Sequence, residues 1–174
     1  MENNSKVVKA ARIAERDAAS RPADDDVFDR IVRQGPLTDM WRLTLWGNFY
    51  CEPIFAELAE NFDVTRDEFN VLYSLASCGS LLAKNVCEVT GRPKNSISRA
   101  VNSLVERKMI KRKTNAYDRR ESPLVLNESG LRLYERVLPV AVARQTLMLK
   151  ALNDKDRREL DRILEKLMSA KHEW

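Results

Sequence analysis

Basic side chains are concentrated in one short stretch of the chain. Residues 93–120 contain nine Lys and Arg against two acidic residues, whereas residues 36–92 contain four basic and eight acidic ones. The net charge of the whole chain is only +4. Positive charge concentrated beside an acidic body is typical of a surface that binds a polyanion while the rest of the protein avoids unspecific binding. The alternative is a solvated basic face.

Inside this stretch, apolar and polar residues recur with a helical period. The apolar face that we expect to be buried consists of Ile97, Ala100, Val101, Leu104 and Val105. The opposite face carries Asn95, Ser98, Arg99 and Asn102. The major groove of duplex DNA admits one helix, and Arg and Asn have the forked donors and acceptors that read base edges. A helix that begins at Pro93 is therefore suited to reading a DNA sequence.

The residue types that most enzymes and metal sites require are scarce. The single histidine, His172, lies two residues from the end, which excludes Ser-His-Asp and Cys-His arrangements and zinc sites with paired histidines. The cysteines, Cys51, Cys78 and Cys87, have no C-x-x-C spacing, so neither a disulfide framework nor a structural zinc site is expected. Glycines that could form a phosphate-binding loop are isolated. We expect a protein that is not an enzyme and that needs no cofactor or metal.

The predicted reading helix is positioned by a second helix and a hairpin. A short helix is expected from Ser80 to Thr90, with Gly91 as the left-handed residue that ends it. Its predicted buried residues are Leu82, Ala83, Val86 and Val89. Two short helices joined at a glycine turn form a helix-turn-helix. Residues 109–114 and 122–126 then predict two strands joined by a polar loop, which is the wing of a winged helix.

Longer amphipathic helices are expected on both sides of this lobe. Residues 37–62 have apolar residues every three or four positions, and Pro53 should kink or interrupt that helix. Thr65 and Glu68 have the spacing of a capping box for the next helix. The residues expected to be buried in that next helix are Phe69, Leu72, Tyr73, Leu75 and Ala76. Residues 131–174 predict two further amphipathic helices that are too apolar to lie exposed on a monomer.

The first 35 residues predict an arm in two pieces. Its first piece has a stripe of small apolar residues that is too thin to fold alone. Asp24, Asp25 and Asp26 are expected to cap a short second helix that contains Phe28 and Ile31. The arm is either a disordered tail or a segment that docks on a partner subunit.

Together these features resemble the MarR family of bacterial transcriptional regulators. The resemblance extends from about Val64 to Gly130. It rests on the helix entry 64–69, the turn at Gly91, the segment 96–110, the wing tip Tyr117-Asp118-Arg119-Arg120, and the segment 126–130. It implies a homodimer whose terminal helices interlock, and in which each wing and recognition helix contacts one half of a near-palindromic operator.

The fold that we expect is mainly α-helical with a small β-hairpin wing. Residues 63–126 would form the winged helix-turn-helix lobe that binds DNA. Residues 36–62 and 127–174 would be dimerisation helices, and residues 1–35 the N-terminal arm. The expected function is that of a sequence-specific transcriptional regulator, a homodimeric repressor that binds double-stranded DNA in the cytoplasm. No run of apolar residues approaches the length of a membrane span.

The resemblance also implies which residues contact DNA. Ser96, Ser98, Arg99 and Asn102 would face the major groove, with Lys94 and Asn95 beside them at the start of the helix. Arg120 would enter the minor groove, and Asp118 would hold it or a neighbour in a charge-assisted pair. Lys111, Arg112, Lys113 and Arg119 would contact phosphates, which fixes the register without reading sequence. The helix departs from the family pattern in opening on Pro93, where a small hydroxyl or acidic cap is usual.

Family members commonly bind a small anionic aromatic compound between the dimerisation region and the DNA-binding lobe. The aromatic residues that would lie there are Trp41, Trp46, Phe49 and Tyr50, and Arg42 or Arg66 could meet a carboxylate. The resemblance therefore implies an aromatic acid or its thioester as an effector that releases the repressor. A plain hydrophobic interface explains the same residues.

Two other functions are consistent with the sequence. A thiol-based redox sensor would use one of the cysteines, although buried spectator thiols also explain them. A winged helix that docks on proteins without binding DNA is the second alternative, and the charge of residues 93–120 argues against it.

Overall fold

The computed structural model describes residues 21–113 and 122–171. The chain divides into two compact units, residues 1–49 and 50–174. The predictions for Asp118, Arg119, Arg120 and the first piece of the arm lie outside the described residues. None of the described helices is long and apolar enough to cross a membrane.

The first unit contains α2 (Arg21–Val32) and the beginning of α3 (Thr38–Phe62). α2 begins at Arg21, so the expectation that Asp24–Asp26 precede and cap this helix is wrong. Pro22 fits the first turn of a helix. Between the helices, the Thr38 hydroxyl donates a hydrogen bond to the Gly35 carbonyl at 2.5 Å.

α3 has the predicted extent and continues through Pro53 without interruption. Of the two outcomes expected at Pro53, a kink or an interruption, the interruption does not occur, and Pro53 is exposed. Water can there replace the backbone hydrogen bond that proline cannot donate. The second half of α3 belongs to the second unit and buries Ile54 and Leu58.

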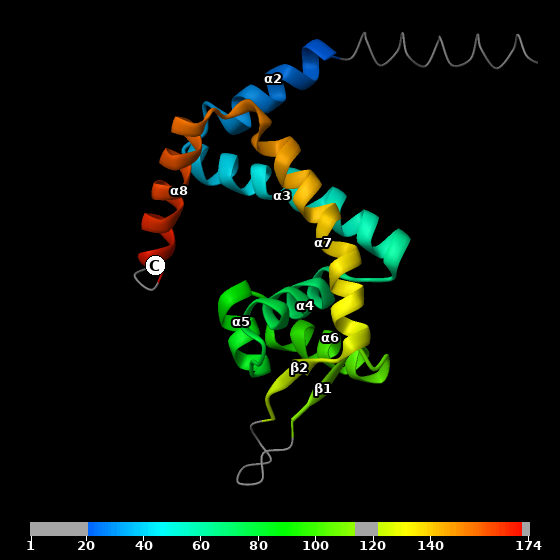
Figure 1. Ribbon diagram of the computed structural model, residues 1–174. Helices are drawn as coiled ribbons and strands as arrows, with labels where there is room; N and C mark the ends of the chain where they lie inside the picture. Colours follow the sequence, from blue (N-terminus) through cyan, green and yellow to red (C-terminus); the bar gives the residue numbers. More distant parts are fainter. Residues whose placement is uncertain (1–20, 114–121, 172–174) are drawn as a thin grey trace, which may run out of the picture. The chain divides into compact units, whose positions relative to one another are not determined.

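The second unit is built around three helices and a hairpin, which gather at one end of α7 (Glu128–Met148; Figure 1). The helices are α4 (Arg66–Cys78), α5 (Ala83–Thr90) and α6 (Lys94–Glu106). Their largest fully buried side chains include Leu72, Leu75, Val86, Ile97 and Leu104. The predicted capping box at Thr65 and Glu68 is present, and Gly91 ends α5 in the left-handed conformation with φ 63°.

The wing base is an antiparallel pair of strands, β1 (Ile110–Arg112) and β2 (Leu124–Leu126), with Ile110 opposite Leu126. Leu81 adds a bridge to Leu124, in which each backbone N–H donates to the other residue's carbonyl, at 3.2 and 2.8 Å. This extended bridge explains why α5 begins at Ala83 and not at Ser80 as predicted. The predicted helix-turn-helix and hairpin are confirmed in type and order.

α7 (Glu128–Met148) begins beside the hairpin and is followed by a short 3₁₀ turn, η1 (Leu149–Ala151), and by α8 (Asp154–Ser169). Gly130 allows α7 to start there, because a Cβ at this position would collide with the Met109 carbonyl oxygen. The side chain of Asn127 donates to the Lys108 carbonyl at 2.9 Å, and its backbone N–H donates to the Met109 carbonyl at 2.8 Å. These contacts fasten the start of α7 to the chain that leaves α6.

Candidate functional site

The polar face of α6 is open to solvent. Lys94, Asn95, Ser98, Arg99 and Asn102 are exposed, and Ser96 is half-buried. On the other face Ile97, Ala100, Val101 and Leu104 are buried in the core. The structure therefore brings the four side chains predicted to face the major groove, with Lys94 and Asn95 beside them, to one short helix that is held by its apolar face.

Three of the four predicted phosphate-binding residues lie beside this helix, and the fourth, Arg119, is outside the described residues. Lys111, Arg112 and Lys113 are exposed on β1 and the residue that follows it. The Arg112 guanidinium donates a hydrogen bond to the Asn102 side-chain oxygen at 3.1 Å. This bond ties the wing to the exposed face of α6, so that a cationic group lies next to Asn102, which is predicted to face the major groove.

α6 begins without a side-chain cap. Pro93 occupies the N-cap position with φ −59° and ψ 141°, and its carbonyl accepts from Ser96 and Ile97 at 3.0 and 3.1 Å. Since no side chain caps the first turn, its free backbone N–H groups add a partial positive charge to that of Lys94. This end of α6 is suited to an anion such as a phosphate.

An ion pair connects the turn before α6 to α4. Arg92 donates to both carboxylate oxygens of Asp67, with distances of 2.5 Å from Nε and 3.2 Å from Nη2. The hydrogen bond to Asp67 raises the pKa of the Arg92 guanidinium. A bidentate pair of this kind fixes orientation as well as distance, so the turn that leads into α6 is held against α4.

A second connection between α4 and α6 is centred on Glu68, which is 3% exposed. Its carboxylate accepts from the Thr65 backbone N–H at 2.8 Å, the Thr65 hydroxyl at 3.0 Å, the Ser103 hydroxyl at 2.7 Å and the Arg107 guanidinium at 3.2 Å. Burial acts to raise the pKa of Glu68, but these hydrogen bonds and the Arg107 charge outweigh it and hold the pKa below its usual value.

The sequence prediction included none of these connecting residues as site residues. Glu68 was expected only as the partner of Thr65 in a capping box. Its contacts with Ser103 and Arg107 join residues 35 and 39 positions apart, and the Arg92–Asp67 pair joins residues 25 apart. Local spacing gives no signal for pairs so far apart.

A cavity of about 740 Å³ lies in the second unit, lined by residues of α3, α4, α5 and α7. Two of the predicted effector-binding residues, Tyr50 and Arg66, line it. The other four, Trp41, Arg42, Trp46 and Phe49, belong to the first unit. Trp41 and Trp46 are exposed there. The structure thus brings only part of the predicted effector set to this cavity.

One wall of the cavity is a row of aromatic rings. Phe55, Phe69 and Tyr73 follow one another with ring centroids 6.0 and 6.1 Å apart, and Arg66 lies over the Phe55 ring at 5.1 Å. Burial, together with the neighbouring Cys51 and Tyr73, raises the pKa of Tyr50. The Tyr50 hydroxyl therefore stays protonated at neutral pH and can donate a hydrogen bond.

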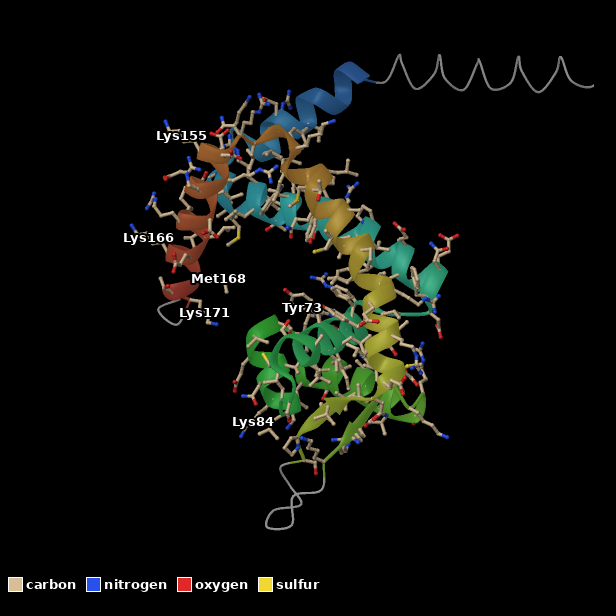
Figure 2. The ribbon with its side chains drawn as sticks, in the orientation of Figure 1. Tyr73, Lys84, Lys155, Lys166, Met168 and Lys171 are labelled. Carbon is tan, nitrogen blue, oxygen red and sulfur yellow. The ribbon has the colours of Figure 1, made fainter. Side chains whose placement is uncertain are left out.

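Two residues predicted to be buried are open to solvent. Tyr73 is 50% exposed and Val89 is 64% exposed, and both line the cavity. Figure 2 labels Tyr73 at the surface of α4. The prediction was wrong because an apolar face indicates contact with something apolar and does not distinguish the protein core from the wall of a cavity.

Arg66 is the only Lys, Arg, Asp or Glu among the residues that line the cavity in the described part of the chain. The walls combine aromatic rings with hydroxyl and amide groups. A mainly apolar cavity with few polar groups is typical of a small-molecule site. A single cation in it favours a ligand with one negative charge.

Residues 62–121 match the sequence model of the MarR family. No curated protein matches the chain.

Solved structures of similar fold cover most of the chain. A MarR/EmrR family transcriptional regulator from Acinetobacter sp. ADP1 is 21% identical, with a TM-score of 0.71 over 78% of this chain and 96% of its own. A mutant MarR from E. coli complexed with operator DNA is 19% identical, with a TM-score of 0.64 over 80% of this chain and 96% of its own.

A third structure, of BpsR from Bordetella bronchiseptica, concerns the regulation of its DNA binding by 6-hydroxynicotinic acid. BpsR is 20% identical, with a TM-score of 0.61 over 73% of this chain and 98% of its own. These structural similarities confirm the expected fold, which is mainly helical with a winged helix.

Proposed function

We propose that this chain, whose residues 62–121 match the MarR family model, is a DNA-binding transcriptional regulator of that family and acts as a homodimeric, cytoplasmic repressor of a palindromic operator. We propose further that a small aromatic anion releases it from DNA. The operator, the dimer and the effector are supported by different parts of the molecule.

The exposed face of α6 carries the proposal for DNA binding. Arg99 and Asn102 offer donors and acceptors that suit base edges in a major groove, and the wing residues Lys111–Lys113 add charge for phosphates. Arg120, at the predicted wing tip, is proposed to enter the minor groove.

The terminal helices support a dimer. On α8 the apolar residues Ile163, Leu167 and Met168 are exposed, and on α7 so are Val142 and Leu147. In Figure 2, Met168 projects from one side of α8 while Lys155 and Lys166 project from the other. An apolar side this extensive fits a second copy of the chain. Two copies would place the half-sites about one helical turn of DNA, roughly 34 Å, apart.

The proposal is tested by selecting duplexes from a random-sequence library with the wild-type protein. We expect a two-fold symmetric consensus with half-sites about 10 base pairs apart. The Arg120→Ala variant should lose affinity for the selected duplex more than for random duplex. A selection that yields no consensus, or equal losses on both duplexes, would contradict the proposal.

The effector is proposed to bind in the α3–α4–α5–α7 cavity with its negative charge on Arg66. Support comes from Arg66, which lies over the aromatic row, and from the regulation of BpsR by an aromatic acid. Fluorescence anisotropy of the labelled selected duplex would report its release by a panel of aromatic acids and their thioesters.

A matched variant pair sharpens this test. Arg66 stacks on Phe55 inside the cavity, whereas Arg136 stacks on Phe62 at 5.3 Å and does not line it. Arg66→Gln should raise the concentration of acid needed for release, and Arg136→Gln should not. Equal responses would exclude Arg66 as the anion-binding group.

A thiol-based response is the second candidate, because Cys51 and Cys78 both line the same cavity and are free. Peroxide treatment of wild type, Cys51→Ser and Cys78→Ser, read by duplex release, separates the two mechanisms. Release in wild type that is absent from one serine variant would favour the thiol mechanism over the aromatic acid.

A further inference from the structure

Helix α4 takes part in both the cavity and the recognition helix. Arg66, Phe69 and Tyr73 face the cavity, spaced three and four residues apart. Asp67 and Glu68, from the same first turn as Arg66, hold the turn before α6 and α6 itself. One helix therefore contacts the proposed effector site on one side and the DNA-reading element on another.

Glu68 makes the more deeply buried of these two connections. Its side chain is 4% exposed, against 19% for Asp67 in its pair with Arg92. A buried carboxylate is costly unless its hydrogen-bond partners are in place. Since two of the partners, Ser103 and Arg107, lie at the end of α6 or directly after it, only a narrow range of α6 positions satisfies the carboxylate.

The hydrogen bonds of Glu68 restrain the rotation of α6, and this rotation sets the position of the exposed polar side chains. Ser103 is adjacent to Asn102, and the two side chains lie on different faces of the helix. The Ser103 hydroxyl is bound to Glu68, while the Asn102 oxygen is bound to Arg112 on the wing. A rotation of α6 that breaks the first bond also moves Asn102 and Arg99 relative to the wing.

We propose that Glu68 is a positioning residue for DNA recognition, which sets the rotation of α6 through Ser103 and Arg107 and links that rotation to the α4 wall of the cavity. This inference rests on the proposed DNA-binding function. It requires no contact between Glu68 and DNA. Loss of the Glu68 charge should therefore reduce discrimination between DNA sequences more than it reduces binding to DNA as such.

The experiment compares dissociation constants for the selected duplex and for a random duplex of equal length. The specificity ratio of the two is measured for wild type, Glu68→Gln and Glu106→Gln. Glu106 is exposed at the end of α6 and makes no contact with Glu68, so Glu106→Gln removes one carboxylate charge from the recognition helix and leaves the Glu68 hydrogen bonds intact. Circular dichroism confirms that each variant is folded at the assay temperature.

For Glu68→Gln we expect the specificity ratio to fall by about ten-fold, the effect of about one misplaced base contact. Binding to the random duplex should stay within about two-fold, because phosphate contacts tolerate small rotations. Glu106→Gln should leave the ratio unchanged. A folded Glu68→Gln protein with the wild-type ratio would overturn the inference.

Ser103→Ala keeps the Glu68–Arg107 pair and removes one hydrogen bond. If Glu68→Gln does not fold, the specificity ratio of Ser103→Ala tests the positioning role of Glu68 instead. The specificity ratio of Ser103→Ala should fall by about three-fold, and an unchanged ratio would overturn the inference. Failure of the proposed DNA-binding function gives a different result from failure of this inference. In that case the specificity ratio of the wild-type protein would itself be close to one. That result would remove both proposals.

Discussion

α6 and α8 are both amphipathic helices of the second unit, but they meet different surroundings. α6 has 13 residues and buries Ile97, Ala100, Val101 and Leu104 against its own chain. α8 has 16 residues and buries none, although its sequence has a regular apolar stripe. The periodicity of apolar residues in the sequence therefore identifies the apolar side of a helix, but it does not identify the surface that packs against that side. The apolar side of α6 packs against the core of the winged-helix lobe, and we propose that the apolar side of α8 packs against a second copy of the chain.

The largest expected effect comes from emptying the core beneath α6. Leu104 is fully buried, so Leu104→Ala should lower the free energy of unfolding by about 3 kcal/mol, the usual cost of a cavity of this size. Chemical denaturation at one protein concentration measures the change. A loss near zero would mean that α6 is not packed as described.

The next largest effect should come from α8, and it should depend on concentration. Ile163 and Leu167 are exposed in the single chain. If a second copy covers them, replacing both by Asp should weaken the dimer by at least about thirty-fold, because two charges would be buried without partners. Sedimentation equilibrium measures this, with Lys166→Asp on the polar side as the control. A dimer unaffected by the double variant would remove α8 from the interface.

The sequence predicted much of the fold because the relevant signals are local. The Thr65–Glu68 capping box, the left-handed Gly91 and the apolar stripe of α6 all involve residues within a few turns of one another. The polar face of α6 followed from the same stripe. The wing strands were recognisable because β-forming residues flank a polar loop.

What the sequence could not predict depends on distant pairs. The Leu81–Leu124 bridge removed three residues from the predicted start of α5, and nothing near Leu81 indicates it. The contacts of Glu68 with Ser103 and Arg107 form only when α4 and α6 are packed. Tyr73 and Val89 are apolar residues on a cavity wall, and the sequence pattern placed them in the core.

A smaller effect on the free energy of unfolding should come from the Glu68 connection between α4 and α6, and it should depend on pH. The pKa of Glu68 is lowered from 4.5 in the folded state. Its carboxylate therefore stabilises the fold above the unfolded-state pKa, and this contribution is lost as the pH falls through the folded value. At pH 7, Glu68→Gln should be less stable than wild type by about 1.5 kcal/mol.

The difference between the two proteins should shrink as the pH falls below 4.5, the ordinary value for this carboxyl. Thermal unfolding of both proteins from pH 7 to pH 3 measures it. A difference that stays constant over this range would show that Glu68 has the same pKa in the folded and unfolded protein, which would contradict the lowered pKa.

The smallest effect should come from a single wing lysine. Lys113 is exposed beside β1, and we propose that it contacts a phosphate. Lys113→Ala should weaken binding to selected and random duplexes alike and should reduce the slope of log affinity against log salt by about 0.9. Titrations at four salt concentrations measure the slope. A loss confined to the selected duplex would assign Lys113 to base reading.

Hydrogen–deuterium exchange of the protein with and without the selected duplex tests the central claim most directly, because it reports α6 and α8 in one measurement. The claim is that the polar face of α6 and the wing bind DNA, while α8 binds the second copy. Adding duplex to the dimer should slow exchange in residues 94–102 and 111–113 and leave residues 155–168 unchanged. Unchanged exchange in residues 94–102 on a protein that has bound the duplex would contradict the account.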